Sequence, residues 1–401
     1  MKNTKGKYNL AAFFSGVGGI ELGFEQTGKF NIVYANEFDK NARITYIRNF
    51  GDSFLDPRDI HDVEPNDIKD NIDIIVGGFP CQAFSIAGYR KGFEDERGDL
   101  FFELLRLIQA KKPRAIFIEN VKNLVSHEKG NTFKVIREAL TINGYFIKWK
   151  VLNSKDYGNI PQNRERIYLV GFTDKNAFDK FKFPEQIELS TPLADIIEYD
   201  TKQDEKYYYR KHKQKFYDEL EKNITNKDSV YQWRRQYVRE NKSGVIPTLT
   251  ANMGTGGHNV PLVLTKSGIR KLTPRETFNA QGFPTDYNLP EIANGQLYKQ
   301  AGNSVVVPVI KRIANEIVKA LDESSEIINS DEINGKYAIL KNEINGKFEG
   351  NSFTVSIVNS MNEAEDLIQS YKDGLKILDD LQYLNVINKG SYEKFYSIVP
   401  L

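Results

Sequence analysis

Short apolar runs alternate with amphipathic stretches over the first half of the chain. The runs are rich in β-branched and aromatic residues, as buried strands are, and the stretches between them repeat apolar residues at helical spacing. This alternation predicts an open α/β sheet. Strands are expected at residues 9–14, 32–35, 73–76, 115–118, 145–147, 151–152 and 167–172, and helices at 20–24, 100–110 and 309–321.

The alternation stops near residue 183. Residues 206–241 interleave basic, aromatic and amide side chains, and residues 247–259 form a loop rich in Gly, Thr and Asn. Such a mixture suits contacts with phosphates and base edges, although a charged stretch is as often only a solvated surface. Helical pattern returns after residue 270. Beyond residue 322 the chain is acidic and rich in Asn, and its recurring apolar residues predict a folded segment.

The composition is that of an ordinary soluble globular protein. Of the 401 residues, 40% are hydrophobic and 27% charged, and 55 Lys and Arg against 54 Asp and Glu give a net charge of +1. Bulk charge therefore predicts no partner, and nucleic-acid binding would need a local concentration of basic residues. The sequence has no apolar run long enough for a membrane span and begins with polar residues, so we expect no signal peptide, no membrane association and a cytoplasmic location.

The chain has a single cysteine, Cys81, which excludes internal disulfide bonds and zinc sites built from several cysteines. We therefore expect no metal site. Cys81 follows a predicted strand and the run Gly77-Gly78-Phe79-Pro80. Ligands gather at the carboxyl ends of strands in open α/β sheets, and a thiol is the nucleophile that needs least activation. A lone cysteine is more often a small buried hydrophobe, but the flanking Gly and Pro favour an exposed, rigid loop.

Glycines and acids follow the first strands. Residues 15–19 form a Gly-rich turn, of the kind that lets a nucleotide lie close to the backbone, but the spacing is not the dinucleotide fingerprint Gly-x-Gly-x-x-Gly. Glu37 stands about twenty residues further on, where a ribose diol is usually held. Asp59 could accept a hydrogen bond from an adenine amino group. An acid at a strand end is more often a solvated loop residue.

Two later segments carry further candidate chemistry. Glu119 directly follows four apolar residues, and partial desolvation there would raise its pKa and let it hold a proton. The alternative is a capping acid before the next helix. Arg164 and Arg166, two residues apart on an extended segment, point the same way and could both face one anionic or carbonyl-bearing ligand. The alternative is the solvated face of an edge strand.

Five motifs occur in order, each at a strand end or a helix start. They are Phe14-x-Gly16-x-Gly18-Gly19, Pro80-Cys81-Gln82, Glu119-Asn120-Val121, Gln162-x-Arg164-x-Arg166 and Gly302-Asn303-Ser304-Val305. With a variable basic segment between the fourth and the fifth, they closely resemble the cytosine-5 DNA methyltransferases of bacterial restriction-modification systems. The resemblance covers about residues 8–320.

The resemblance implies a fold and a domain arrangement. Members have the α/β fold of S-adenosylmethionine-dependent methyltransferases, a Rossmann-like mixed sheet with helices on both faces, plus a smaller irregular target-recognition domain. Here the catalytic and cofactor domain would comprise residues 1–185 and 269–322, with target recognition at 186–268. Residues 323–401 are a C-terminal extension that most compact members lack, and we assign it no role.

The same resemblance implies the chemistry. Cys81 would add to carbon 6 of the target cytosine, and Glu119 would donate a proton to ring nitrogen 3. Arg166, with Arg164 beside it, would hold the cytosine carbonyl. The methyl donor would be S-adenosyl-L-methionine. Its implied binding residues are Phe14, Gly16, Gly18, Gly19, Glu37, Phe38, Asp59, Ile60, Gly78, Pro80, Asn303 and Val305.

The implied substrate is double-stranded DNA, from which the cytosine must be flipped out to reach Cys81. The expected DNA-binding residues are Gln82, Ser85, Arg234, Arg235, Thr248 and Thr250. The recognition segment faintly resembles members that act on CCNGG-type sites. We also expect a partner restriction endonuclease of the same specificity and a monomer on DNA in the bacterial cytoplasm and nucleoid.

Other functions stay open at this point. An RNA cytosine-5 methyltransferase is disfavoured by the long basic aromatic insertion, and a non-catalytic DNA-binding regulator is disfavoured by the intact Cys81, Glu119 and Arg166. A NAD-dependent oxidoreductase is disfavoured by the glycine spacing. A DNA amino-methyltransferase would need an Asn/Asp-Pro-Pro-aromatic motif, which the sequence lacks.

Overall fold

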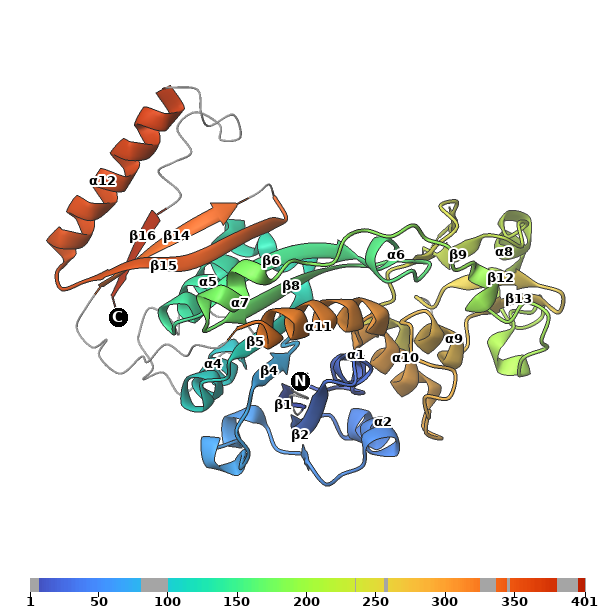
Figure 1. Ribbon diagram of the computed structural model, residues 1–401. Helices are drawn as coiled ribbons and strands as arrows, with labels where there is room; N and C mark the ends of the chain where they lie inside the picture. The colour runs from blue at the N-terminus through green and yellow to red at the C-terminus, as the bar shows by residue number, and fades with distance from the viewer. Residues whose placement is uncertain are drawn as a thin grey trace. The chain divides into compact units, whose positions relative to one another are not determined.

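The computed structural model describes residues 7–80, 100–234, 236–255, 259–324, 337–344, 347–380 and 396–400 (Figure 1). The chain divides into two compact units. The first comprises residues 1–62, 152–166 and 183–316, and the second comprises residues 63–151, 167–182 and 317–401. Among the helices of the described ranges, none combines the length and the apolar character needed to cross a membrane.

The first unit begins with three parallel strands in the order β1-β2-β3. Two helices alternate with them, and the second begins at an N-cap, Asp39, whose carboxylate accepts the backbone N–H groups of Asn41 and Ala42. The elements are β1 (Tyr8–Phe13), α1 (Gly19–Glu25), β2 (Phe30–Asn36), α2 (Lys40–Phe50) and β3 (Leu55–Asp56). The strands expected at residues 9–14 and 32–35 are therefore confirmed.

The later part of the first unit holds a small sheet in the order β10-β9-β12-β13, which is followed along the chain by three helices. Pro274 starts the first of these helices, and Thr273 and Glu276 form a reciprocal capping box around it. The elements are α6 (Ser154–Tyr157), β7 (Gln162–Asn163), α8 (Tyr217–Asn223), β9 (Val230–Trp233), β10 (Val238–Asn241), β11 (Ile246–Pro247), β12 (Leu262–Thr265), β13 (Gly268–Lys271), α9 (Pro274–Asn279), α10 (Asn294–Asn303) and α11 (Val307–Asp322). The last six residues of α11 belong to the second unit.

The second unit holds a mixed sheet in the order β16-β14-β15-β6-β8-β5-β4. Strands β4 and β5 are parallel, whereas β15 is antiparallel to both β6 and β14. The elements are β4 (Ile74–Gly77), α4 (Leu100–Lys111), β5 (Ala115–Val121), α5 (Asn131–Ile142), β6 (Phe146–Asn153), β8 (Glu165–Phe172), α7 (Lys175–Lys180), β14 (Tyr337–Ile344), β15 (Glu349–Val358), α12 (Met361–Asp380) and β16 (Tyr396–Pro400). The expectation of an α/β fold with a mixed sheet is confirmed.

The C-terminal extension is an integral part of the second unit. Its strand β15 pairs with β6, and α12 packs on β14 and β15 through Ile339, Val358, Ala364 and Ile368 (Figure 1). One buried cation joins the extension to α5. Arg137 donates hydrogen bonds to Asn342 Oδ1 at 3.2 Å and Ser352 Oγ at 2.9 Å, and its guanidinium lies over the rings of Phe133 and Trp149. Burial lowers the pKa of Arg137 to about 10.

Replacing this arginine tests how firmly the extension is held. We expect Arg137→Ala to lower the free energy of unfolding by about 2–3 kcal/mol, because it removes two buried hydrogen bonds and leaves a cavity between the rings. Urea unfolding followed by circular dichroism measures the change. Lys134→Ala, on the exposed face of the same helix, is the control and should cost less than about 1 kcal/mol. Equal losses in the two variants would show that Arg137 does not hold the extension.

Candidate functional site

The turn after β1 has an unusual backbone. Phe14, Gly16 and Gly18 all have positive φ angles, of 56°, 56° and 78°. A non-glycine residue rarely adopts this conformation, and such strain concentrates at functional sites. A Cβ atom added at Gly16 would meet nothing within 4 Å, whereas one at Gly18 would lie 2.2 Å from Cε2 of Phe50. The turn is therefore packed on one side and open on the other.

Glu37 fixes the open side of this turn. Its Oε2 accepts the backbone N–H of Gly16 at 2.7 Å, and its Oε1 accepts that of Asp39 at 2.5 Å. Burial raises the pKa of Glu37, and these two hydrogen bonds only partly oppose the effect. Beside it, the Phe38 side chain is 67% exposed. The end of β2 thus presents a fixed carboxyl group next to an exposed aromatic ring.

Asp59 and Ile60 follow β3. Ile60 is buried, and Asp59 Oδ1 accepts the backbone N–H of His61 at 3.1 Å and lies 2.5 Å from its ring Nδ1. Partial burial acts to raise the pKa of Asp59, but the contacts with His61 outweigh it, so the pKa is lowered. The carboxylate expected to meet an adenine amino group therefore already has a partner within its own loop.

The segment that returns from α10 closes against the glycine turn. A Cβ atom at Gly19 would lie 2.7 Å from Ser304 Oγ and 3.0 Å from Val305 Cγ2, so only glycine allows this approach. Asn303 is exposed and Val305 is buried. The structure thus brings residues from the two ends of the sequence pattern together within the first unit.

Two polar side chains of α10, Lys299 and Gln300, fix it on α2. Lys299 Nζ lies 2.7 Å from Asp39 Oδ2. Gln300 accepts a hydrogen bond from the Thr45 hydroxyl at 2.8 Å and donates one to the Asn41 carbonyl at 2.9 Å. Neither residue stands out in the sequence, because their partners lie about 260 residues away along the chain.

Arg164 is buried and contacts main-chain carbonyl groups. Its side chain is 1% exposed, and its guanidinium donates to three backbone carbonyls: Leu249 O at 2.6 Å, Gly302 O at 3.0 Å and Ser304 O. These three carbonyls are acceptors found for Arg164 among the described residues; that it faces a ligand together with Arg166 stays a prediction. Arg166 is half-buried and donates to the Glu165 carbonyl at 2.8 Å.

Gln162 supports the same junction. Its amide donates to the Ala280 carbonyl at 2.6 Å, and its Oε1 accepts the backbone N–H of Leu249 at 3.1 Å. Nearby, the Thr248 hydroxyl donates to the Asn163 carbonyl at 2.6 Å. The motif around Arg164 therefore binds the main chain of Leu249 from two directions, and the Thr248 side chain adds a third contact. The spacing of Gln162 and Arg164 is visible in the sequence, but their burial and their main-chain partners are not.

The second unit carries the remaining candidates. Glu119 is 8% exposed and lies within β5, not after it, since β5 runs to Val121. Its neighbour Asn120 donates to the Phe79 carbonyl at 2.9 Å, which ties β5 to the segment after β4. Gly78 is half-buried and Pro80 is exposed. Cys81, Gln82, Ser85 and Arg235 lie outside the described residues.

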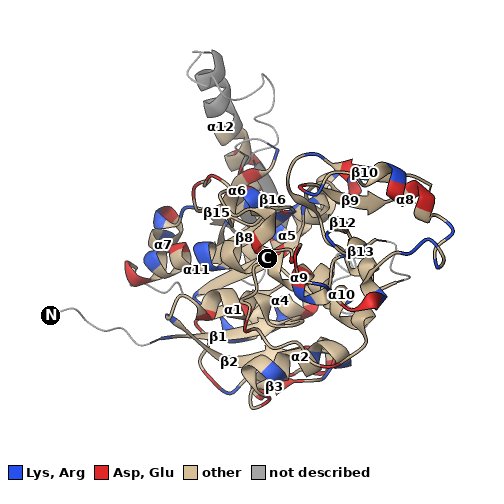
Figure 2. Cartoon of the chain, turned by 90° about the vertical axis from the view of Figure 1, so that its right-hand side faces the viewer, with Lys and Arg blue, Asp and Glu red and all other residues tan. Residues whose placement is uncertain are grey.

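The expected DNA-binding residues of the recognition segment lie at the surface. Arg234, Thr248 and Thr250 are all exposed, and Arg234 donates to Gln232 Oε1 at 3.1 Å. Basic residues in this region are interspersed with acids, and both colours occur on α8 and on β10 in Figure 2. Three ion pairs illustrate this mixing: Lys206–Asp204, Arg210–Glu205 and Lys211–Asp218. The basic composition of residues 206–241 therefore does not give a uniformly positive surface.

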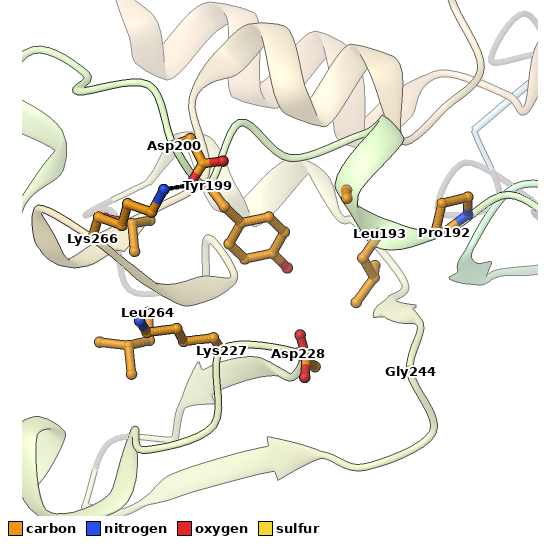
Figure 3. Close-up of a pocket in the computed structure, with 11 residues that line it drawn as sticks. Pro192, Leu193, Tyr199, Asp200, Lys227, Asp228, Gly244, Leu264 and Lys266 are labelled. Atoms are coloured by element: carbon orange, nitrogen blue, oxygen red, sulfur yellow. Dashed lines mark ion pairs between the residues drawn. The ribbon is translucent and has the colours of Figure 1, made fainter.

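One open cavity of about 460 Å³ lies in the first unit (Figure 3). Leu193 and Leu264 contribute apolar surface, and Lys266 is paired with Asp200 at 2.7 Å on its rim. The residues that line it include none of the candidates expected from the sequence. We therefore do not assign the cavity to the site.

Comparisons with known proteins agree with the motif pattern. The family model described as C-5 cytosine-specific DNA methylase matches residues 8–319. The chain is 61% identical over 313 residues to the type II methyltransferase M.Bsp6I of Bacillus sp. (strain RFL6), covering 78% of this chain and 99% of the relative. It is 41% identical over 327 residues to the type II methyltransferase M.SsoII of Shigella sonnei, covering 80% and 82% of the two chains.

Solved structures show the same fold at lower identity. A mutant of Spodoptera frugiperda DNMT2 aligns with a TM-score of 0.59 and 22% identity, covering 79% of this chain and all of that one. The Entamoeba histolytica methyltransferase EhMeth aligns with a TM-score of 0.59 and 21% identity, covering 80% of this chain and all of that one. With a family match over most of its length, the chain belongs to the C-5 cytosine-specific DNA methylases and is a DNA cytosine-5 methyltransferase.

Proposed function

We propose that the chain methylates carbon 5 of one cytosine in a specific duplex DNA site by covalent catalysis through Cys81, with S-adenosyl-L-methionine as methyl donor. The observation that supports this most is the meeting, in the first unit, of the open glycine turn, Glu37 and the returning pair Ser304-Val305. A strained turn with one open side and a fixed carboxyl group at its edge suits a nucleoside-type ligand that lies against the backbone.

The residues around the turn fit the cofactor. Gly16 leaves open space, the exposed ring of Phe38 can cover an adenine, and Glu37 keeps lone pairs for ribose hydroxyls. S-adenosyl-L-methionine would supply a methyl group activated by its sulfonium. We assign its binding to Phe14, Gly16, Gly18, Gly19, Glu37, Phe38, Asp59, Ile60, Gly78, Pro80, Asn303 and Val305.

The proposed reaction needs three protein groups. The Cys81 thiolate adds to carbon 6 of the cytosine while Glu119 gives a proton to ring nitrogen 3 and Arg166 holds the carbonyl oxygen. Carbon 5, made electron-rich by this addition, takes the methyl group. A base then removes the proton from carbon 5, the electron pair released expels the Cys81 thiolate, and ring nitrogen 3 returns its proton to Glu119.

The DNA side of the proposal requires base flipping, because a stacked cytosine exposes neither face to a side chain. Thr248, Thr250, Arg234, Arg235, Gln82 and Ser85 are the proposed contacts. We further propose a CCNGG-type site, action as a monomer in the bacterial cytoplasm, and protection of host DNA against an endonuclease of the same specificity.

Trapping with a modified base tests this function. The protein is incubated with S-adenosyl-L-methionine and duplex DNA that contains 5-fluorocytosine, and covalent adducts are sought by mass spectrometry. Fluorine cannot leave carbon 5 as a proton does, so an adduct of protein, DNA and methyl group should accumulate. The same assay with RNA is the comparison. An adduct only with RNA, or none with either, would contradict the proposal. Bisulfite sequencing of DNA from an expressing host then gives the recognition site.

Substitution of Glu37 tests the cofactor site. Because Glu37 accepts two backbone N–H groups through two oxygens, Glu37→Gln leaves one of them unpaired and removes a ribose acceptor. We expect the Kd for S-adenosyl-L-methionine to rise about 10- to 100-fold. Isothermal titration calorimetry measures this change. Glu25→Gln, at the exposed end of α1, is the matched control and should bind normally. An unchanged Kd in Glu37→Gln would exclude Glu37 from the cofactor site.

A further inference from the structure

Polar side chains are buried on the packed side of the glycine turn. Glu21, in α1, is 1% exposed, and Ser15 in the turn and Tyr46 on α2 are buried as well. Among the described residues, neither carboxyl oxygen of Glu21 and neither of the Ser15 and Tyr46 hydroxyls makes a well-formed hydrogen bond, although both hydroxyls lie close enough to the carboxyl group to lower its pKa. Buried polar groups are nearly always hydrogen-bonded, so a cluster of unsatisfied atoms from three segments next to a ligand site calls for a functional explanation.

These groups act on one another electrostatically. Burial raises the pKa of Glu21 to about 7, the hydroxyls of Ser15 and Tyr46 act to lower it, and the Glu37 carboxylate acts to raise it. Burial raises the pKa of Tyr287, in the segment after α9, and Glu21 adds to this effect. At neutral pH, Glu21 can therefore either hold or release a proton. Burial is the main cause that raises the pKa of Tyr46, and Glu21, Tyr287 and Glu25 add smaller contributions.

The neighbours of Glu21 also hold the turn. The Tyr46 ring lies 4.7 Å from that of Phe50, and Phe50 is the ring against which Gly18 packs. The Tyr287 hydroxyl donates to the Val17 carbonyl. Since Gly16 faces open space while these contacts lie on the packed side, a ligand on the turn would have the Glu21 carboxyl group behind the backbone that it contacts.

We propose that Glu21 is a positioning residue that makes this site prefer the positively charged methyl donor over its uncharged thioether product. The inference rests on the proposed function, in which the turn binds the methionine part of the cofactor. A sulfonium close to a buried carboxyl group favours the carboxylate form, because the local dielectric is low. Binding of the donor would therefore release the Glu21 proton to solvent, whereas binding of the product would leave it in place. The preference for the donor should rise with pH.

Calorimetry on the full-length protein tests this inference. S-adenosyl-L-methionine and S-adenosylhomocysteine are titrated in two buffers of different ionisation enthalpy, which gives the number of protons released by each. If the bound sulfonium lowers the pKa of Glu21 by about one unit, the donor should release about 0.4 more protons than the product at pH 7. The ratio of the two Kd values should then change about fivefold between pH 6 and pH 8 in favour of the donor. The titration of Glu37 cancels in this comparison, because both ligands carry the same ribose.

Variants separate this role from a structural one. Glu21→Gln should abolish the difference in proton release between the two ligands and the pH dependence of their Kd ratio, and Glu25→Gln should keep both. Tyr46→Phe removes a hydroxyl that lowers the pKa of Glu21, so the change in the ratio of the two Kd values should occur at higher pH. If Glu21→Gln fails to fold, this variant tests the role of Glu21 instead. Equal proton release by the two ligands in the wild type, or a difference that persists in Glu21→Gln, would overturn the inference. If neither ligand binds, the proposed function itself fails.

Discussion

Replacement of Cys81 by serine is expected to lower the rate of cytosine methylation by about 10⁴-fold or more. A serine hydroxyl stays protonated near neutral pH and is a far weaker nucleophile than a thiolate toward carbon 6 of a pyrimidine. Turnover is measured by transfer of labelled methyl groups to duplex DNA, and the adduct with 5-fluorocytosine DNA should disappear. Since Cys81 is the only cysteine, the protection of the thiol from maleimide by bound DNA gives a second, unambiguous measurement.

The serine variant should still fold and bind. Its thermal unfolding temperature and its Kd values for DNA and S-adenosyl-L-methionine should equal those of the wild type, because one small polar side chain replaces another. A variant that methylates DNA at more than about a hundredth of the wild-type rate would exclude Cys81 as the nucleophile. If the variant no longer binds DNA, its rate does not report on the nucleophile. Protection of the wild-type thiol from maleimide by bound DNA then tests whether Cys81 lies at the DNA site.

The second large effect is expected at Arg164. Arg164→Met should lower the free energy of unfolding by about 3–5 kcal/mol, since it leaves three backbone carbonyls at a buried junction without their donor. Urea unfolding and differential scanning calorimetry measure the loss. Arg164→Lys should restore only part of it, because one ammonium cannot reach carbonyls that a planar guanidinium contacts from two nitrogens.

Arg166→Met is the matched comparison, two residues away. It should keep the stability of the wild type within about 1 kcal/mol but lower kcat by about 10²- to 10³-fold, since we propose that Arg166 stabilises charge on the cytosine carbonyl. The opposite outcome, in which Arg164→Met is stable but inactive, would show that Arg164 faces the substrate as the sequence pattern suggested.

The apolar pattern predicted most strands because buried strands need uninterrupted apolar runs. The runs at residues 32–35, 74–76 and 115–118 all form strands of the two units. Residues 145–147 and 151–152, expected as separate pieces, form the single strand β6. Lys148 and Lys150 interrupt the apolar run, but they alternate with the buried Trp149 and lie on the other face of the strand. The alternation of buried and half-exposed residues in β6 is that of a strand with one buried face.

The sequence predicts the site residues whose role depends on the type of side chain. It does not predict those whose role depends on hydrogen bonds to distant main-chain atoms. The approach of Gly19 to Ser304 and Val305 follows from two motifs at opposite ends of the pattern. The role of Arg164 could not be read from its spacing to Arg166, since its acceptors are carbonyls 85 to 140 residues away. For the same reason the two-residue periodicity alone does not decide whether both arginines face one ligand, and that expectation stays a prediction.

Gln162 and Arg164 contact residue 249 only through its main-chain N–H and carbonyl groups. Every amino acid supplies the same peptide group, so these two contacts do not depend on the side chain at residue 249, whereas the contact with the Asn163 carbonyl needs the Thr248 hydroxyl. Substitution of exposed residues such as Arg234 and Thr250 should therefore leave these hydrogen bonds intact. On the proposed function, we expect the side chains that contact DNA in residues 186–268 to be able to diverge toward new DNA sequences while the main-chain contacts of Leu249 stay the same.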